Sequence, residues 1–358
     1  MARIGINALY LIPGGVGGTE IYLRQLLAAL ASMDDGNEYF VFTNLETGAD
    51  LVPGRPNFHR VPQNVRARFR PARILWEQTL LPVQAARCRL DVLLNPGFTA
   101  PVFAPCPNVT VFHDLQHKRH PEHFRWFDLP FWRLLLWSSA HRSRRLIAVS
   151  EATRDDLIRF YRLPAERISV VHHGIEPEFF TLDRTRQEPF VLCVSTLHPH
   201  KNLDRLIRAY ARRKREWRLI FTGMRGFFAG ELDALIEKLG VKDSVQLTGW
   251  IPHGQLLRLY ATADAFVYPS TFEGFGMPVL EAMAAGIPVA CSDIAPLREV
   301  AGDAALFFDP LSEDAIAAAL DRIVTDRPLR VRLAQAGPER ARQFSWEKAA
   351  RETLLALR

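Results

Sequence analysis

The sequence has few cysteines and no long apolar run, and each of these absences limits what the chain can be. None of its four cysteines lies close to another in the sequence: Cys88, Cys106, Cys193 and Cys291. No disulfide framework or metal-binding spacing can be read from them, so a reducing cytoplasm is the expected location. No run reaches the roughly 18 apolar residues that a transmembrane helix requires. The N-terminal segment lacks the apolar core and cleavage site of a signal peptide.

The common nucleotide-binding glycine motifs are also missing. The segment GGVGG, Gly14 to Gly18, lies between an apolar strand pattern and an amphipathic helix pattern. Glu20 stands where the third glycine of G-x-G-x-x-G would be, and no Gly-Lys-Ser/Thr follows as in a P-loop. Glycines let backbone N–H groups approach a ligand, and the helix N-terminus that follows favours an anion. Phosphate contact and a purely structural tight turn are both compatible with this loop.

The length and the pattern of apolar segments indicate two α/β domains. A chain of 358 residues exceeds one ordinary core. Short apolar strands alternate with helical stripes, stop over residues 174–188 and then alternate again, which predicts two doubly wound parallel sheets. We therefore expect Rossmann-like domains at 1–173 and 189–343, joined by a linker at 174–188. Ligands of such folds bind beyond the carboxyl ends of strands, so a cleft between the two domains is the expected site.

The basic residues are concentrated in one part of the chain. Between Arg55 and Arg145 there are 15 Lys and Arg against 5 Asp and Glu, whereas the remainder holds 30 basic and 34 acidic residues. The same part is rich in Phe and Trp. This combination predicts a surface for anionic lipid headgroups or an anionic acceptor, although an arginine-rich face without a partner would have the same composition. No nucleic-acid-binding module accompanies the charge, so we do not expect a nucleic-acid partner.

Two single residues stand where a site could form. His113 comes just after an apolar strand and is suited to donating a hydrogen bond to a substrate hydroxyl, although a lone histidine at a strand end is more often a structural residue. Lys201 begins a helix, where a cation is unfavourable beside the macrodipole unless an anion lies between them. Lys201 therefore indicates a phosphate clamp, the alternative being a solvated lysine.

The stretch PSTFEGFGMPVLEAMAAG places two carboxylates around a glycine-rich turn. Glu273 lies in the loop after an apolar strand, and Gly274 and Gly276 expose backbone N–H groups. Pro278 suits the first turn of a helix, and Glu281 is predicted to lie in that turn, where the helix dipole stabilises a carboxylate. Carboxylates accept hydroxyl hydrogen bonds, and free amides suit an anion. A ligand with a sugar, phosphates and a ribose would use all of these groups.

At these residues the chain resembles the family 4 glycosyltransferases, which are retaining enzymes with the two-domain GT-B architecture. EGFGMPVLE matches the E-x7-E signature of that family at Glu273 and Glu281. The similarity extends to the Gly-rich loop, to HD after a strand, to HKNL, to TGW and to FSWEKAARETL near the end. The resemblance implies that the last helix, 344–358, crosses back to the first domain.

The resemblance also implies a role for each matching residue. Glu281 would accept hydrogen bonds from the ribose, Glu273 and the neighbouring amides would hold the donor sugar, and Lys201 would neutralise the diphosphate. The implied catalytic residues are His113, Lys201 and Glu273. The implied donor-binding residues are Gly17, Gly18, Thr196, Lys201, Trp250, Ile251, Glu273, Gly274, Phe275, Gly276, Met277 and Glu281.

The details of the resemblance favour one donor. Thr196 stands where the family often has an arginine, so one cation of the usual pair is absent, and His200 or Arg205 could compensate. The segment from Ser195 to Asn202 and the WEQ of Trp76 to Gln78 are similar to mannosyltransferase-like members, which favours GDP-mannose. The chain has no Asp-x-Asp metal motif, consistent with an enzyme that needs neither a divalent cation nor another cofactor.

The expected function is therefore retaining transfer of a sugar to a glycan or lipid-linked glycan acceptor in cell-surface polysaccharide or glycolipid synthesis. The part from Arg55 to Arg145 would face the acceptor or an anionic inner membrane leaflet. The protein is therefore expected in the cytoplasm, bound peripherally to the inner face of the membrane. Three alternatives remain at this point: a UDP-sugar-dependent transferase of the same family, a sugar-nucleotide epimerase on the same fold, and a non-catalytic nucleotide-sugar-binding protein.

Overall fold

A computed structural model describes residues 1–15, 17–212, 216–226 and 228–358. The chain divides into two compact units, the first formed by Met1–Gly174 with Ser345–Arg358 and the second by Ile175–Phe344. The final helix therefore belongs to the first unit. The segment that was expected to be a linker contributes its residues from Ile175 onward to the second unit. No helix in the described ranges is both long and apolar enough to cross a membrane.

The first unit is built on a seven-stranded sheet whose order is β3-β2-β1-β4-β5-β6-β7 and whose paired strands are all parallel. Its strands are β1 (Arg3–Asn7), β2 (Glu38–Thr43), β3 (Phe58–Pro62), β4 (Val92–Asn95), β5 (Asn108–Phe112), β6 (Arg145–Ala148) and β7 (Ile168–Val170). The central strands are buried on both faces, as a parallel sheet covered by helices requires. This is the doubly wound order: successive strands are added toward one edge of the sheet from β1 to β3, and toward the other edge from β4 onward.

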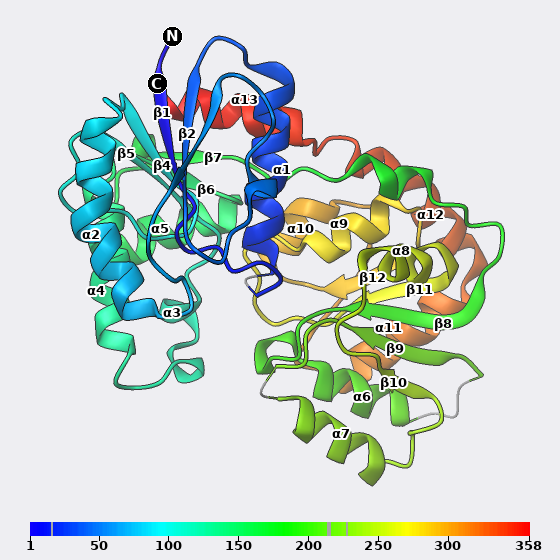
Figure 1. Cartoon of the computed structure of the whole chain (residues 1–358). Coiled ribbons are helices and arrows are strands. Elements are labelled where there is room, and N and C mark those ends of the chain that lie inside the picture. Colours follow the sequence, from blue (N-terminus) through cyan, green and yellow to red (C-terminus); the bar gives the residue numbers. More distant parts are fainter. Residues whose placement is uncertain (16, 213–215, 227) are drawn as a thin grey trace. The chain divides into compact units, whose positions relative to one another are not determined.

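The helices of the first unit follow the predicted alternation. They are α1 (Gly18–Met33), α2 (Arg70–Arg87), α3 (Gln116–Arg119), α4 (Leu129–Arg142), α5 (Glu151–Tyr161) and α13 (Trp346–Leu357), with short 3-10 turns η1 (Ala49–Leu51), η2 (Pro121–His123) and η3 (Ala165–Arg167). The side chains of Ser150 and Ser345 cap α5 and α13 by accepting a backbone N–H three residues on. Helix α13 packs against α1, as Figure 1 shows, so the end of the chain completes the first core.

The second unit repeats the same topology. Its six-stranded parallel sheet has the order β10-β9-β8-β11-β12-β13. Its strands are β8 (Glu188–Val194), β9 (Arg218–Thr222), β10 (Val245–Leu247), β11 (Ala263–Tyr268), β12 (Val289–Ser292) and β13 (Leu306–Phe308). The strand order reverses between β8 and β11, so the loops after these two neighbouring strands leave the sheet side by side.

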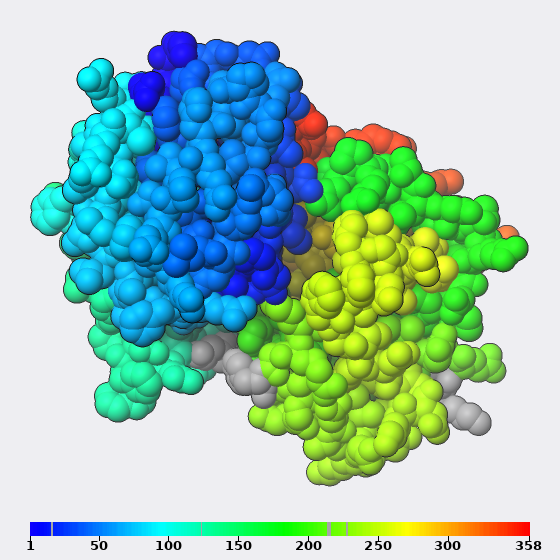
Figure 2. Space-filling model, viewed as in Figure 1, coloured from blue at the N-terminus to red at the C-terminus, as the bar shows by residue number. Residues whose placement is uncertain are grey.

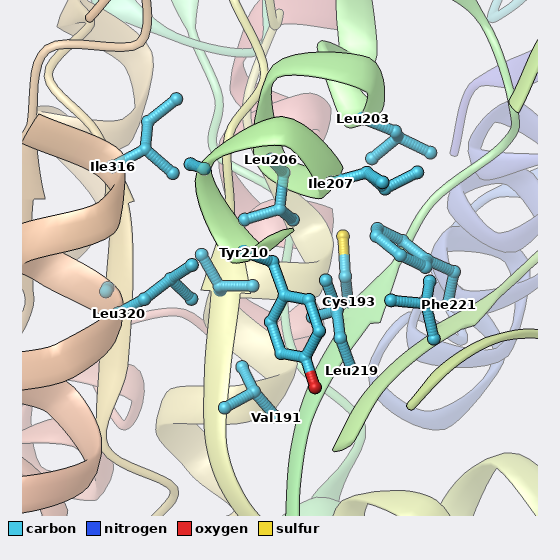
Figure 3. Packing of buried hydrophobic residues seen from close by; sticks show 14 of the residues in the cluster. Val191, Cys193, Leu203, Leu206, Ile207, Tyr210, Leu219, Phe221, Ile316 and Leu320 are labelled. Atoms are coloured by element: carbon cyan, nitrogen blue, oxygen red, sulfur yellow. The ribbon is translucent and has the colours of Figure 1, made fainter. Parts of the chain in front are cut away.

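Helices cover both faces of the second sheet. They are α6 (Leu203–Ala211), α7 (Ala229–Lys238), α8 (His253–Thr262), α9 (Met277–Ala284), α10 (Ala295–Ala301), α11 (Glu313–Thr325) and α12 (Arg327–Ala341), with 3-10 turns η4 (Pro177–Thr181) and η5 (Pro199–Lys201). Figure 3 shows the core on one face, where Leu206 of α6 and Leu320 of α11 pack over Val191 and Leu219 of the sheet. This packing holds α6, and the loop that precedes it, against β8.

Candidate functional site

An ion pair lies at the point where the second sheet reverses its strand order. Lys201 comes from the loop after β8, and Glu273 from the loop after β11. The Lys201 Nζ donates to Glu273 Oε1 at 2.6 Å and to the Tyr268 hydroxyl at 3.1 Å. Only 14% of the Lys201 side chain and 11% of the Glu273 side chain are exposed. The structure thus brings together two residues that are 72 positions apart in the sequence.

A network of short polar contacts holds these two loops in register. Asn202 has a left-handed backbone with φ +58°, and its side-chain amide donates to the carbonyls of Pro269 at 3.0 Å and Pro310 at 2.7 Å. The His200 carbonyl accepts from the backbone N–H of Thr271 at 2.8 Å. Sequence reasoning missed Asn202, although Asn is one of the few residue types that tolerate this conformation.

The ion pair changes the interpretation of Lys201. The cation at the helix start needs an anion, and within the chain the Glu273 carboxylate is that anion. The guanidinium of Arg205, which could have replaced the missing family arginine, donates to Asn202 Oδ1 at 2.8 Å and supports the loop. Lys201 is thus the cation that the structure places directly against Glu273.

Glu281 is buried in α9 beneath the same region. The Tyr260 hydroxyl donates to Glu281 Oε2 at 2.6 Å. Burial raises the pKa of Glu281 to about 7, and the Tyr260 hydrogen bond offsets part of this rise. The expectation that the helix dipole stabilises this carboxylate in the first turn was wrong, because α9 begins at Met277 and Glu281 is one turn further on. Loss of hydration outweighs the dipole at this position.

A row of buried aromatic rings joins the two carboxylates. The rings of Tyr260, Phe266 and Tyr268 stack in sequence, with centroids 6.0 and 6.2 Å apart. The hydroxyl at one end of the row binds Glu281, and the hydroxyl at the other end accepts from Lys201. Both Glu273 and Glu281 raise the pKa of Tyr268, after burial, so both charges act on one ring. One tyrosine hydroxyl thus contacts Glu281, and the other contacts the lysine that is paired with Glu273.

The turn between the carboxylates is fixed by sterics. Gly276 precedes α9 with φ +103°, and a Cβ there would lie 2.3 Å from Leu297 Cδ2. The Phe275 ring is buried and meets Phe344 edge-on at 5.9 Å. Phe275 can therefore offer a ligand only its backbone. Pro278 has no N–H and the Val279 N–H donates to the Gly276 carbonyl at 3.0 Å, so at the start of α9 the Met277 N–H is the group suited to an anion or to a sugar oxygen.

The other predicted donor residues of the second unit follow two other strands of its sheet. Thr196 follows β8, and its carbonyl accepts from His198 N–H at 2.9 Å. Trp250 and Ile251 follow β10. Trp250 is 66% exposed, so its ring does not pack in the core. These residues lie beyond the carboxyl ends of their strands, as expected for a site in this fold.

The glycine-rich loop of the first unit is closed by Glu20. Its carboxylate accepts from the Gly14 N–H at 2.8 Å and from Arg24 Nε at 2.9 Å. Gly17 has φ +60°, which favours glycine on backbone grounds alone. Gly18 does not have a positive φ, and among the described residues a Cβ placed there would meet no atom within 4 Å. The fold therefore gives no steric reason for glycine at position 18, and the approach of a ligand to this backbone stays a prediction. Val16 lies outside the described residues.

Replacing Gly18 by alanine tests this reasoning. We expect an unchanged or slightly raised melting temperature, because alanine is better than glycine in a helix by about 0.5–1 kcal/mol. Donor affinity should fall about tenfold if a ligand approaches the backbone. Thermal unfolding and nucleotide titration of the same variant measure both effects. A loss of stability, or an unchanged affinity, would show that Gly18 serves only the turn.

His113 lies in a buried aromatic cluster of the first unit. Its Nε2 is 2.9 Å from the Pro96 carbonyl, its ring meets Tyr22 edge-on at 4.9 Å, and it stacks on His173 at 5.6 Å. Burial lowers the pKa of His113 to about 4, so the ring is neutral at pH 7. A carbonyl only accepts, so Nε2 carries the proton and Nδ1 can only accept. The expected donation to a substrate hydroxyl is thus reversed in direction.

One group among the described residues has the composition of a metal site. The ligand atoms of Glu176, Glu178 and His253 lie within 4.8 Å of one another in the second unit. His253 Nε2 is already paired with Glu178 at 2.6 Å, and both side chains are largely exposed. Their charges act on Glu281: Glu176 raises its pKa and His253 lowers it. We interpret the group as a surface ion pair.

Two family models match the chain. Glycosyltransferase Family 4 matches residues 16–179, and Glycosyl transferases group 1 matches residues 175–340. The chain is 33% identical over 263 residues to the O-antigen chain mannosyltransferase B of Escherichia coli, covering 69% of each protein. It is 32% identical over 215 residues to the O-antigen chain mannosyltransferase RfbU of Salmonella typhimurium, covering 59% of each.

The fold has close counterparts among solved structures. Sucrose-phosphate synthase from Thermosynechococcus elongatus superposes with a TM-score of 0.80 at 20% sequence identity, over 99% of this chain and 98% of that one. At this identity the likeness concerns the fold alone. The two Rossmann-like sheets therefore confirm the expected GT-B architecture.

Proposed function

The chain belongs to glycosyltransferase family 4, and on this premise we propose that it transfers a mannosyl group from GDP-mannose to a glycan or lipid-linked glycan acceptor. The names of its O-antigen mannosyltransferase relatives support the sugar and a role in cell-surface polysaccharide synthesis. The observation that carries the proposal is the arrangement of Lys201, Glu273 and Glu281, held by one row of aromatic rings where the second sheet reverses its order.

Each of these groups would serve one part of the donor. The Glu281 carboxylate accepts hydrogen bonds from the ribose hydroxyls. Glu273 and the turn at the start of α9 together hold the transferred sugar. Lys201 exchanges part of its bond to Glu273 for the diphosphate, whose charge grows as the leaving group departs. The site already contains a positive charge fixed by two partners, so no side chain needs large reorientation at the moment of reaction.

Transfer with retention would proceed on one face of the sugar. The bond from the anomeric carbon to the phosphate oxygen breaks, the acceptor oxygen bonds to the same carbon, and the acceptor proton passes to the departing phosphate oxygen. Neutral His113 would accept a hydrogen bond from a sugar hydroxyl through Nδ1. Lys201 and the helix N-termini would provide the charge stabilisation, so the reaction would not require a divalent cation or another cofactor.

A thermal-shift panel tests the donor. GDP and GDP-mannose should raise the melting temperature more than UDP, ADP and their sugar conjugates, because a ligand that binds only the folded state stabilises it by mass action. A response to UDP or UDP-sugars alone would refute the GDP-mannose assignment. Conversion of GDP-mannose to an epimer without acceptor would refute transfer.

We also propose that the first unit binds the cytoplasmic face of an anionic membrane. The contact would be made by α4 and by the segment before this helix. Phe131, Leu134 and Trp137 are exposed along one side of α4, and Trp126 just before the helix is 83% exposed. Arginines flank these side chains, as expected for an interfacial helix. In Figure 2 this segment, in teal, forms part of the surface of the first unit.

Vesicle binding tests the membrane contact. The protein should sediment with vesicles containing phosphatidylglycerol and much less with phosphatidylcholine alone, and added salt should weaken the binding. Trp126→Ser combined with Phe131→Ser should reduce binding about tenfold. Leu311→Ser, at a residue of the second unit that is 65% exposed, is the matched control and should have no effect. Equal binding by both variants would contradict the assignment.

A further inference from the structure

A cavity of about 500 Å³ lies in the first unit beyond the carboxyl ends of β2 and β3. We name it the arginine pocket. Its lining residues are Leu45, Glu46, Arg66, Arg68 and Phe69. It lies beyond the strand ends, where parallel sheets of this kind bind ligands, yet it contains none of the residues assigned above to the donor or to the sugar.

The pocket has unneutralised positive charge. No carboxylate in the described part of the chain pairs with Arg66 or Arg68, whereas Arg24 and Arg55 of the same unit are paired with Asp50 and Asp35. The one acidic residue in the pocket is Glu46. Its two oxygens accept the backbone N–H groups of Ala67 at 2.8 Å and Arg68 at 3.3 Å, so hydrogen bonds to the loop partly balance its charge.

The same contacts hold the backbone from which the two arginine side chains project. Val65 and Ala67 are buried, while Arg66 and Arg68 between and after them are exposed. The Val65 carbonyl accepts the Leu45 N–H at 3.0 Å, which ties the two sides of the pocket together. A loop held in this way loses little conformational entropy when a ligand binds.

A helix N-terminus adds to the positive potential. Helix α2 begins at Arg70, directly after Phe69, and no side chain caps it. Its first N–H groups therefore have no side-chain acceptor and carry the positive end of an 18-residue helix dipole. Two free guanidiniums beside such a helix start form a site for a tetrahedral oxyanion, and arginine binds phosphate oxygens in pairs.

The remaining wall of the pocket is apolar. Phe69 is 63% exposed and Leu45 is 56% exposed, so both line the pocket with accessible apolar surface. A ligand that covers both and also pairs with the guanidiniums carries a phosphate next to an apolar group. A free sugar would leave the guanidiniums without an anion.

We propose that the arginine pocket binds a phosphate or diphosphate ester that carries an apolar chain. This inference rests on the proposed function, since it makes the phosphate part of a lipid-linked acceptor the ligand. A phospholipid headgroup has the same chemistry and is the other possible source of the phosphate.

Titration calorimetry with farnesyl diphosphate, below its micelle concentration, tests the pocket. The full-length protein is first saturated with GDP so that the probe cannot occupy the donor site. Wild type should bind farnesyl diphosphate and not farnesol, and Arg66→Gln combined with Arg68→Gln should weaken binding about tenfold or more. Arg351→Gln, at an exposed position of α13, loses the same kind of charge outside the pocket and should bind like wild type.

The outcomes separate the pocket from the donor site. GDP binding should be the same in all variants, so its absence from wild type would defeat the proposed donor while the farnesyl diphosphate titration still tests the pocket. No binding of the probe by wild type, equal binding by the double variant, or equal binding of farnesol would overturn the proposal. Sedimentation with phosphatidylglycerol vesicles identifies the source: unchanged binding by the double variant assigns the pocket to the acceptor phosphate, and reduced binding assigns it to a headgroup.

Discussion

Replacing Lys201 by methionine is expected to lower kcat about 100- to 1,000-fold. One preorganised donor aimed at developing charge typically contributes about this much to a rate. Lys201 is the cation held at the switch point of the second sheet by Glu273 and Tyr268. The affinity for GDP should change less than kcat, because the charge on the diphosphate oxygen is greatest as the leaving group departs. Steady-state kinetics with a saturating donor measure the effect.

The same substitution should also destabilise the protein. Glu273 is 11% exposed, so removal of Lys201 leaves a mostly buried carboxylate without its partner. Breaking such a pair costs about 3–5 kcal/mol. Urea unfolding should therefore show a lower free energy of unfolding for Lys201→Met, and a loss of activity in this variant alone would be ambiguous.

A double variant separates the two effects. Lys201→Met combined with Glu273→Gln removes both charges, so most of the lost stability should return. Because Glu273 is itself assigned to the donor sugar, Glu273→Gln alone is the control, and turnover of the double variant should be well below that of this single variant. Recovery of activity together with stability would show that Lys201 only supports the fold. Unchanged turnover in Lys201→Met would remove it from the reaction altogether.

Replacing Glu281 by glutamine is expected to stabilise the unliganded protein above pH 7. The pKa of Glu281 is about 7 in the folded protein, against an ordinary value of 4.5. Between these values the folded state binds more protons than the unfolded state, so stability falls as the pH rises, and the cost is complete above pH 7. At about 1.4 kcal/mol for each pKa unit the cost is roughly 3 kcal/mol. Glutamine removes this cost at pH 8, and it changes the free energy of unfolding little near pH 4.5.

The gain in stability should be accompanied by a loss of function. Ribose hydroxyls donate to a carboxylate more strongly than to an amide, so GDP affinity should fall about tenfold or more in Glu281→Gln. Tyr260→Phe is the matched variant, because it keeps the carboxylate and removes the hydrogen bond that lowers its pKa. Its pH dependence of stability should extend to higher pH. Equal GDP affinity in Glu281→Gln, or the same pH dependence in all three proteins, would contradict this role.

The architecture could be predicted from the sequence because it rests on short-range patterns. Apolar strands such as Val92–Asn95 and helical stripes such as Gly18–Met33 are each visible within one window, and their alternation implies parallel sheets. The predicted position of Glu273 beyond a strand end follows from the same pattern. Such statements require no knowledge of which distant residues touch.

The chemistry of the site depends on long-range contacts and burial, which the sequence does not display. Nothing local pairs Lys201 with Glu273, and only the order of the sheet brings the loops after β8 and β11 together. The pKa of Glu281 could not be anticipated because burial, not position in a helix, decides it. The direction of the His113 hydrogen bond depends on the carbonyl of Pro96, which belongs to a different strand connection.

The central claim is most directly tested by NMR of a transfer reaction from 13C-labelled GDP-mannose to octyl α-mannoside. Wild type is predicted to release GDP and to form an α-linked mannosyl product, and Lys201→Met combined with Glu273→Gln is predicted to form almost none under the same conditions. A β-linked product, transfer from UDP-glucose in place of GDP-mannose, or equal transfer by the double variant would contradict the account.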